Sequence, residues 1–239
     1  FAEVAQVTPE AIETFVNEPG APATRAKRLT ILRQFFKYCQ RQGWCKDNPA
    51  ERVEAPKIKP TRYPTPFSQE QLEHIFADLE RDQDQRFALL AKLLLASGMR
   101  VGDAAAIQPE SLRDLGVRLR TEKTGGEILL PLEAGLFDAV RAVAASGGFP
   151  AGQSTPTFIR QAQRRFKRAF IAAGCRQASL HWFRHTMASK LRAKGATPAE
   201  IGDVLGISAR VAEKHYTKWT PERAKRLAIL LAESAQQES

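Results

Sequence analysis

The sequence lacks the features of a membrane protein or a disulfide-stabilised protein. No apolar run in its 239 residues is long enough to span a bilayer, and no signal peptide is visible. Its three cysteines are odd in number and lack the spacing of a metal site: Cys39, Cys45 and Cys175. We therefore expect free thiols in a reducing cytoplasm, with no bound metal, no cofactor and no membrane partner.

Acidic residues are missing from two long stretches. Residues 19–46 contain seven Lys or Arg and no Asp or Glu, and residues 139–199 contain eleven Lys or Arg and no acid. A solvated surface ordinarily mixes both signs of charge. With a formal net charge of +10, the pattern indicates a polyanionic partner. We expect this partner to be nucleic acid, in preference to a membrane surface or an acidic protein.

Prolines mark the boundary between two predicted domains. Five prolines between Pro49 and Pro66 interrupt helical patterns and indicate an extended linker. A chain of 239 residues also exceeds the usual size of one domain, about 100–150 residues. Because the chain starts at Phe1 instead of Met, we expect its first domain to be trimmed. We predict a helical DNA-binding domain over 1–57, a linker over 58–66 and a second domain over 67–239.

The first acid-free stretch predicts a basic helix. The helix would open near Thr24 as cap and close near Gly43, after an earlier helix capped by Thr8. Its apolar side chains follow helical spacing and should be buried: Leu29, Leu32, Phe36 and Cys39. A basic exterior on a helical bundle is the simpler interpretation, and it is compatible with binding to a DNA backbone. The predicted DNA contacts are Arg25, Lys27, Arg28, Arg33, Lys37 and Arg41.

Helical patterns also dominate the second domain. Ser68 and Gln71 form a capping-box pattern, and "QRFALLAKLLLASGM" predicts a core helix that ends near Gly98. A period-two alternation over residues 117–122 and the Gly-Gly pair at 125–126 predict one β-hairpin. We therefore expect a mainly α fold with a small antiparallel β-sheet (α+β). The predicted DNA contacts of this domain are Arg160, Arg164, Arg165 and Arg168.

The remaining motifs contain the residue types that phosphodiester cleavage requires. Cleavage without metal requires cations around the non-bridging oxygens, a nucleophile, and an acid for the leaving oxygen. Arg100 follows an abrupt glycine corner, and "HWFRHT" places His181, Arg184 and His185 on one helix. Taken alone, these could be surface polar residues. Of three tyrosines, Tyr216 is the only one after the histidine motif.

The order of these motifs resembles that of the tyrosine recombinases, also called phage-type integrases. The family has a "TGLR" corner, and "SGMR" with Arg100 is similar to it. The family also has a hairpin lysine before Thr-Gly, and "EKTGG" with Lys123 is similar to that motif. Their His-x-x-Arg-His-Thr motif matches "HWFRHT". Their "LGHS", nine residues before the nucleophilic tyrosine, is similar to "LGIS" before Tyr216. Five motifs in the same order make the resemblance specific.

The resemblance implies a core-binding domain followed by a catalytic domain. By resemblance, Tyr216 attacks a phosphodiester and forms a 3′-phosphotyrosyl bond, while His181 helps to deprotonate it. Arg100 and Arg184 would hold the non-bridging oxygens, and Lys123 would protonate the leaving 5′-oxygen. Asp103, just after Arg100, falls where the family often has a supporting acid. Neither a metal nor ATP is required.

One residue departs from the family pattern. Ile207 stands where the family usually has His or sometimes Trp, whose side chain donates a hydrogen bond to the scissile phosphate. Isoleucine cannot do so. His215 neighbours the nucleophile, but an adjacent helical residue points elsewhere, so we do not expect it to substitute.

Other functions stay open at this point. A type IB topoisomerase uses a similar set of residues, and a DNA-binding relative with weakened catalysis is compatible with Ile207. The resemblance also implies a monomer in free solution and a tetramer on paired sites, joined through a C-terminal helix that starts at Pro221. We expect a nucleoid-associated enzyme of a phage or mobile element.

Overall fold

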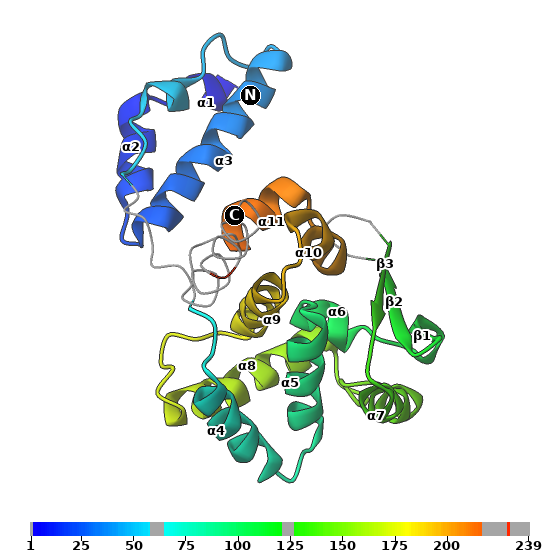
Figure 1. Ribbon diagram of the computed structural model, residues 1–239. Coiled ribbons are helices and arrows are strands. Elements are labelled where there is room, and N and C mark those ends of the chain that lie inside the picture. Colours follow the sequence, from blue (N-terminus) through cyan, green and yellow to red (C-terminus); the bar gives the residue numbers. More distant parts are fainter. Residues whose placement is uncertain (1, 58–64, 121–126, 217–228, 230–239) are drawn as a thin grey trace, which may run out of the picture. The chain divides into compact units, whose positions relative to one another are not determined.

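The computed structural model describes residues 2–57, 65–120, 127–216 and 229, and it divides the chain into two compact units. Unit 1 spans Phe1–Tyr63 and unit 2 spans Pro64–Ser239. The division falls within the segment predicted as a linker, residues 58–66. The fold class is confirmed, because both units are mainly helical and unit 2 contains one small antiparallel sheet (Figure 1). The assignment of unit 1 as a core-binding domain remains a prediction.

Unit 1 is a small helical unit around an apolar core. The Thr8 side chain caps α2 by accepting from the Ala11 N–H, as predicted. The predicted cap of α3 is wrong: the helix begins two residues earlier than Thr24, with a proline in its first turn. The elements are α1 (Ala2–Ala5), α2 (Pro9–Asn17), α3 (Pro22–Arg41) and the 3₁₀ helix η1 (Pro49–Arg52). The core is formed by Ile12, Val16, Leu29, Phe36, Ala50 and Val53, and Cys39 is also buried.

Unit 2 contains the larger core and the sheet. Figure 1 shows α9 between the α5 and α8 helices on one side and the α10–α11 pair on the other, and α9 packs on α5, α10 and α11. The helices are α4 (Gln69–Glu80), α5 (Arg86–Ser97), α6 (Val101–Ala105), α7 (Ala134–Ala145), α8 (Thr155–Ala172), α9 (His181–Ala193), α10 (Pro198–Leu205) and α11 (Ala209–Tyr216), with a 3₁₀ turn η2 (Pro109–Ser111). Among the described helices, none is both long and apolar enough to cross a membrane.

Two predicted helix ends are confirmed in unit 2. Ser68 and Gln71 exchange side-chain and backbone hydrogen bonds at the start of α4, which satisfies two donors that a helix leaves open. The α5 helix is buried on most sides and ends at Gly98, whose φ of 64° favours glycine. A Cβ on Gly98 would also collide with the side chain of Met187.

The sheet is a three-stranded antiparallel meander, β1 (Leu112–Arg113), β2 (Gly116–Arg120) and β3 (Glu127–Pro131). The β2–β3 pair confirms the predicted hairpin, with Val117 opposite Leu130 in the register. Sequence reasoning missed β1, which joins β2 through two positive-φ residues, Asp114 and Leu115. Lys123, the Gly125–Gly126 turn and the C-terminal segment from Pro221 lie outside the described residues, apart from Ile229.

Candidate active site and DNA-binding surface

Arg184 joins three of the predicted motifs. It lies in α9 and is only 4% exposed. Its Nη1 donates to the Gly98 carbonyl at 2.8 Å, and its Nη2 donates to the Leu205 carbonyl at 2.7 Å. Gly98 belongs to the "SGMR" corner and Leu205 to the "LGIS" corner. One side chain therefore holds both corners against the helix of the histidine motif.

The surroundings of Arg184 explain how a guanidinium can be buried there. Gly98 ends α5 and Gly206 ends α10, both in the left-handed conformation, with φ values of 64° and 60°. The last carbonyls of a helix lack partners within it and form the negative end of the helix dipole. The positive charge meets two such ends, and this offsets part of the cost of burying it.

Arg100 lies at the N-terminal end of the short helix α6, two residues after the corner glycine. Its Nη1 is 3.8 Å from Oδ2 of Asp103, whose side chain is 11% exposed. This ion pair is compatible with the predicted supporting role of Asp103. A half-buried carboxylate can orient a guanidinium without neutralising its outward N–H groups.

His181 and His185 contact each other on α9. Their ring centroids are 4.8 Å apart in an edge-to-face arrangement, with 84° between the planes. His181 is exposed, His185 is half-buried, and Arg184 points into the protein. His185 contacts the exposed imidazole of His181 from the next helical turn.

A hollow of about 800 Å³ borders His181. We call it the α8–α9 hollow. Val101, which directly follows Arg100, lines it together with three basic residues of α8 at helical spacing: Arg160, Arg164 and Lys167. The structure therefore brings two predicted DNA contacts, Arg160 and Arg164, to the same hollow as His181. Sequence reasoning did not select Lys167, although its spacing of three residues from Arg164 was available as a signal.

Ile207 completes the end of α10. Its N–H donates to the Gly202 carbonyl at 3.0 Å, while the Gly206 N–H donates to the Asp203 carbonyl at 3.4 Å. These bonds form a Schellman motif, in which the residue after the glycine commonly makes an apolar contact with the helix. The half-buried Ile207 side chain packs on a cluster that includes Ile201, Leu205 and Ala212. The isoleucine is therefore part of the local packing.

The predicted nucleophile and hairpin lysine are only partly described. Tyr216 is the last residue of α11, which packs against α9 and α10, but its side chain and that of His215 are outside the described part. Lys123 falls in residues 121–126, which the structure does not describe. The β3 strand that follows this segment packs against α10.

Arg165, predicted from the sequence as a DNA contact, forms hydrogen bonds within unit 2. Its side chain is 13% exposed, and it donates to Asp82 Oδ2 at 2.5 Å, to Asp78 Oδ2 at 2.5 Å and to the Asp78 carbonyl at 2.7 Å. These bonds join α8 to α4 and to the turn that follows it. Its neighbours Arg164 and Arg168 are exposed and remain predicted DNA contacts.

The predicted contacts of α3 divide in the same way. Arg33 donates to the carbonyls of Ala50 at 3.1 Å and Val53 at 2.8 Å and so fixes η1 against α3; its DNA contact stays a prediction. Arg25 and Arg28 donate to groups at the end of α2, namely the Asn17 side chain and the Glu18 carbonyl. The predicted DNA contacts of α3 that are exposed are Lys27, Lys37 and Arg41.

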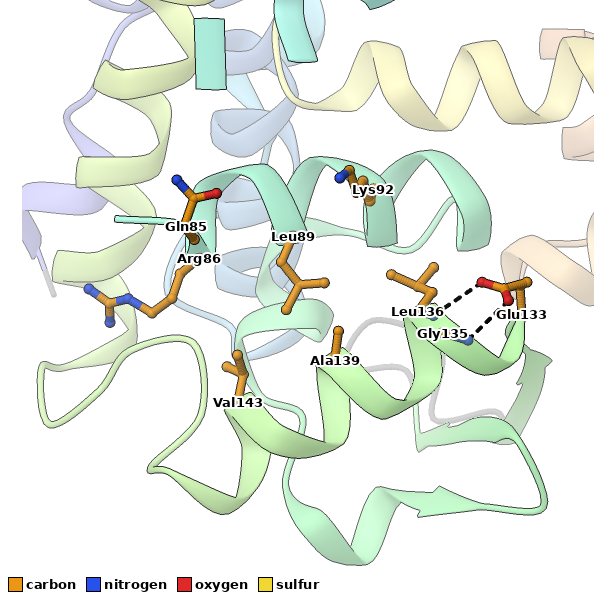
Figure 2. A pocket seen from close by; sticks show the side chains of 9 residues that line it. All are labelled: Gln85, Arg86, Leu89, Lys92, Glu133, Gly135, Leu136, Ala139 and Val143. Atoms are coloured by element: carbon orange, nitrogen blue, oxygen red, sulfur yellow. Dashed lines mark hydrogen bonds between the residues drawn. The ribbon is translucent and has the colours of Figure 1, made fainter. Parts of the chain in front are cut away.

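A second hollow, of about 730 Å³ between α5 and α7, contains none of the predicted catalytic residues (Figure 2). Its charged lining residues already have partners: Glu133 accepts from the N–H groups of Gly135 and Leu136, and Lys92 pairs with Glu80 at 2.8 Å. Arg86 forms a bidentate pair with Asp84. Nothing in this lining indicates phosphodiester chemistry.

A metal site is not evident in the part of the chain that the structure describes, since no three His, Cys, Asp or Glu side chains group together there. The charged groups around Arg184 and His181 are instead cations suited to a phosphate.

The chain is similar to known proteins in sequence and fold. The sequence model of the Phage integrase family matches residues 66–223, more than half of the chain. The chain belongs to this family. The match starts next to Phe67 and includes all of the corners described above.

Relatives of this integrase-family chain are tyrosine recombinases. It is 30% identical to tyrosine recombinase XerD of Caulobacter vibrioides, over 87% of this chain and 76% of that protein. It is 27% identical to tyrosine recombinase XerC of Myxococcus xanthus, over 87% of this chain and 75% of the relative. The fold is similar to that of a lambda integrase dimer bound to a COC′ core site, with a TM-score of 0.71, 18% identity, and coverage of 91% of this chain and 83% of that one.

Proposed function

We propose that this chain is a site-specific DNA recombinase that cuts and rejoins strands through a 3′-phosphotyrosyl intermediate on Tyr216. The observation that carries the proposal is the position of Arg184. Its bonds to Gly98 and Leu205, 86 and 21 residues away in sequence, gather three motifs at one place. Membership of the integrase family supports the same activity.

The proposed reaction exchanges one phosphate ester for another. The phenolic oxygen of Tyr216 attacks the phosphorus, the bond from phosphorus to the 5′-oxygen breaks, and the phosphate stays on the DNA 3′ end. His181 accepts the phenolic proton, and Lys123 gives a proton to the leaving oxygen. Arg100 and Arg184 bind the non-bridging oxygens. The phosphotyrosyl ester conserves the bond energy, so rejoining needs no ATP.

The DNA backbone would follow the α8–α9 hollow and the exposed basic face of α3. Both regions lie in the acid-free stretches, and backbone contacts position a protein without reading sequence. The residues proposed for these contacts are Lys27, Lys37, Arg41, Arg160, Arg164, Lys167 and Arg168.

We also propose an oligomeric state, a cellular location and a genetic origin for the enzyme. We infer a monomer in solution that forms a tetramer on paired sites through the segment after Pro221, acting on the nucleoid in the cytoplasm. A solved structure of a lambda integrase tetramer bound to a Holliday junction is a precedent in the same fold. The relatives named XerD and XerC favour a chromosomal recombinase as much as one of a phage or mobile element.

The test traps the covalent intermediate. A DNA site is first selected with this protein from a random duplex library, and a nicked duplex carrying that site then prevents religation. Wild-type protein should form a covalent adduct, and Tyr216→Phe should abolish it at unchanged DNA affinity. Tyr38→Phe is the matched control, because Tyr38 is an exposed tyrosine of unit 1, and it should leave the adduct intact. An adduct in Tyr216→Phe would assign the nucleophile elsewhere.

A second candidate, a DNA-binding relative with weakened catalysis, is compatible with Ile207 but is not favoured by the named relatives. That side chain packs on α10 and has no donor for a phosphate. Selective DNA binding without any adduct on the nicked duplex would support it. The named relatives do not favour the topoisomerase alternative. Relaxation of a supercoiled plasmid that lacks the selected site would be evidence for it.

A further inference from the structure

Phe67 contacts the helix that carries His181 and Arg184. Its backbone N–H donates to the Thr186 hydroxyl at 2.9 Å, and that hydroxyl donates in turn to the Trp182 carbonyl at 2.8 Å. Thr186 is 1% exposed, and Phe67 is buried as well. The two bonds form a continuous chain from the start of unit 2, through one hydroxyl, to the first turn of α9.

The ring of Phe67 contacts the same part of the helix. Its centroid lies 5.5 Å from that of Trp182 and 5.3 Å from that of Phe183. These two residues separate His181 from Arg184 in the sequence. Aromatic pairs at this distance add to the burial energy of the rings, so backbone and side chain of Phe67 hold the same turn.

The start of α9 depends on such contacts. His181 is its first residue, and the cap residue Leu180 makes no side-chain capping hydrogen bond. The N–H groups of Trp182 and Phe183 donate to the carbonyls of Ser179 and Leu180, at 2.9 and 3.3 Å. Helix ends that lack a side-chain cap still fray more readily than capped ones. Fraying here would displace the His181 imidazole. A displacement of about 1 Å can cost about 10²-fold in rate.

We propose that Thr186 is a positioning residue for the cleavage reaction. By joining the Phe67 N–H to the Trp182 carbonyl, its hydroxyl holds the first turn of α9 and thereby sets the place of His181. The inference rests on the proposed function. Thr186 acts through His181 and not through Arg184, which has separate anchors on Gly98 and Leu205.

Three variants separate positioning from general stability. Thr186→Val keeps the shape of the side chain and removes the hydroxyl, whereas Thr186→Ser keeps the hydroxyl. Val140→Ala is the control for a loss of stability, because Val140 is fully buried in α7, which packs on α5. With saturating nicked duplex, Thr186→Val should slow adduct formation about tenfold at unchanged DNA affinity. Thr186→Ser and Val140→Ala should stay within about twofold of wild type.

A double-mutant cycle tests the route through His181. If Thr186 acts by placing that imidazole, Thr186→Val should have no further effect on the adduct rate in a His181→Ala background. Effects that multiply in the double variant would overturn the proposal. So would a Thr186→Ser variant as slow as Thr186→Val.

Hydrogen exchange supplies a measurement without DNA. Amides in the peptide 181–188 should exchange about fivefold faster in Thr186→Val than in wild type, because one anchoring hydrogen bond is lost. Their exchange rate in Thr186→Ser should equal that of wild type, because the hydroxyl is retained. Equal exchange in the valine variant and wild type would refute the positioning role. If wild-type protein forms no adduct, the proposed function fails, and the exchange result still decides whether Thr186 holds α9.

Discussion

Arg184 and Leu205 are joined by a hydrogen bond of 2.7 Å from the guanidinium to the backbone carbonyl. Leu205 ends α10 two residues before Ile207, and the other hydrogen bond of Arg184 reaches Gly98, two residues before Arg100. The side chain therefore sets the spacing between two corners that approach the same phosphate in the proposed reaction. Its loss should affect both folding and catalysis.

Replacement of Arg184 should reveal both effects. Arg184→Ala leaves two carbonyls without their donor, and we expect a loss of about 2–4 kcal/mol in the free energy of unfolding. Cleavage should fall about 10²-fold or more. Arg184→Lys should be intermediate in stability, because one ammonium cannot span both carbonyls as a planar guanidinium does. Thermal unfolding and adduct formation measure the two effects.

Arg192 is the control for this series. It lies on the same helix and donates one hydrogen bond, to the Ala196 carbonyl at 2.8 Å. Arg192→Ala should cost about 1 kcal/mol or less and leave the adduct rate unchanged. Wild-type cleavage by Arg184→Lys would show that bridging the two corners does not matter for the reaction.

Ile207→His should accelerate the chemical step. The substitution adds a donor that can strengthen its contact as charge develops on the phosphate, so adduct formation should become faster at unchanged DNA affinity. It should also lower stability by about 1 kcal/mol, because Ile207 packs on the end of α10. Ile207→Leu keeps the apolar contact without a donor and should give no gain. A histidine variant no faster than wild type would mean that this site has been rebuilt around isoleucine.

Arg164 and Arg165 should respond differently to the same change. Arg164→Gln should weaken DNA binding evenly across sequences and reduce the salt slope by about 1, as expected for one lost phosphate contact. Arg165→Gln should lower the thermal midpoint and leave the salt slope unchanged, because its partners are Asp78 and Asp82. Binding titrations at several salt concentrations and thermal melts check both. A reduced slope in Arg165→Gln would return that residue to the DNA surface.

Asp82 should make stability fall at low pH. The hydrogen bond from Arg165 holds the pKa of Asp82 below its ordinary value, so the folded state favours the charged carboxylate. Its contribution is present above the unfolded pKa of about 3.9 and is lost as the pH falls through the lower folded value. Asp82→Asn should be less stable at neutral pH and should show a shallower decline on acidification. Thermal midpoints over the acid range measure this.

The control for Asp82 is an exposed pair. Asp138→Asn removes the surface ion pair with Arg141 and should hardly alter the curve. An unchanged acid decline in Asp82→Asn would assign the effect to other carboxylates. Glu10, Glu133 and Glu200 have pKa values lowered by backbone hydrogen bonds and act in the same direction.

Truncation after Trp219 should separate binding from assembly. The truncated protein should bind one site with unchanged affinity, because the proposed DNA contacts precede the cut. Pairing of two sites should decrease if the segment from Pro221 joins protomers. Gel mobility on one-site and two-site duplexes measures both, and equal pairing by the truncated protein would show that the segment serves its own protomer.

Local patterns in the sequence were enough to predict several elements of this fold. The Ser68 capping box, the apolar helix α5 with its end at Gly98, and the β2–β3 hairpin were all predicted correctly. Each depends on neighbouring residues: a side chain three positions from a backbone N–H, an apolar period, or a positive φ that suits glycine. The order of the motifs was likewise visible in the chain itself.

Only the tertiary structure decided what each arginine does. Arg164 and Arg165 are equivalent in the sequence, but successive helical residues point about 100° apart, and Arg165 meets acids that lie 83 and 87 residues away. Arg184, in an acid-free stretch, found its partners in backbone carbonyls at the ends of two distant helices. Composition gives the charge of a stretch. The burial of each arginine side chain and the direction in which it points determine its partner, and the packing of helices distant in sequence sets both.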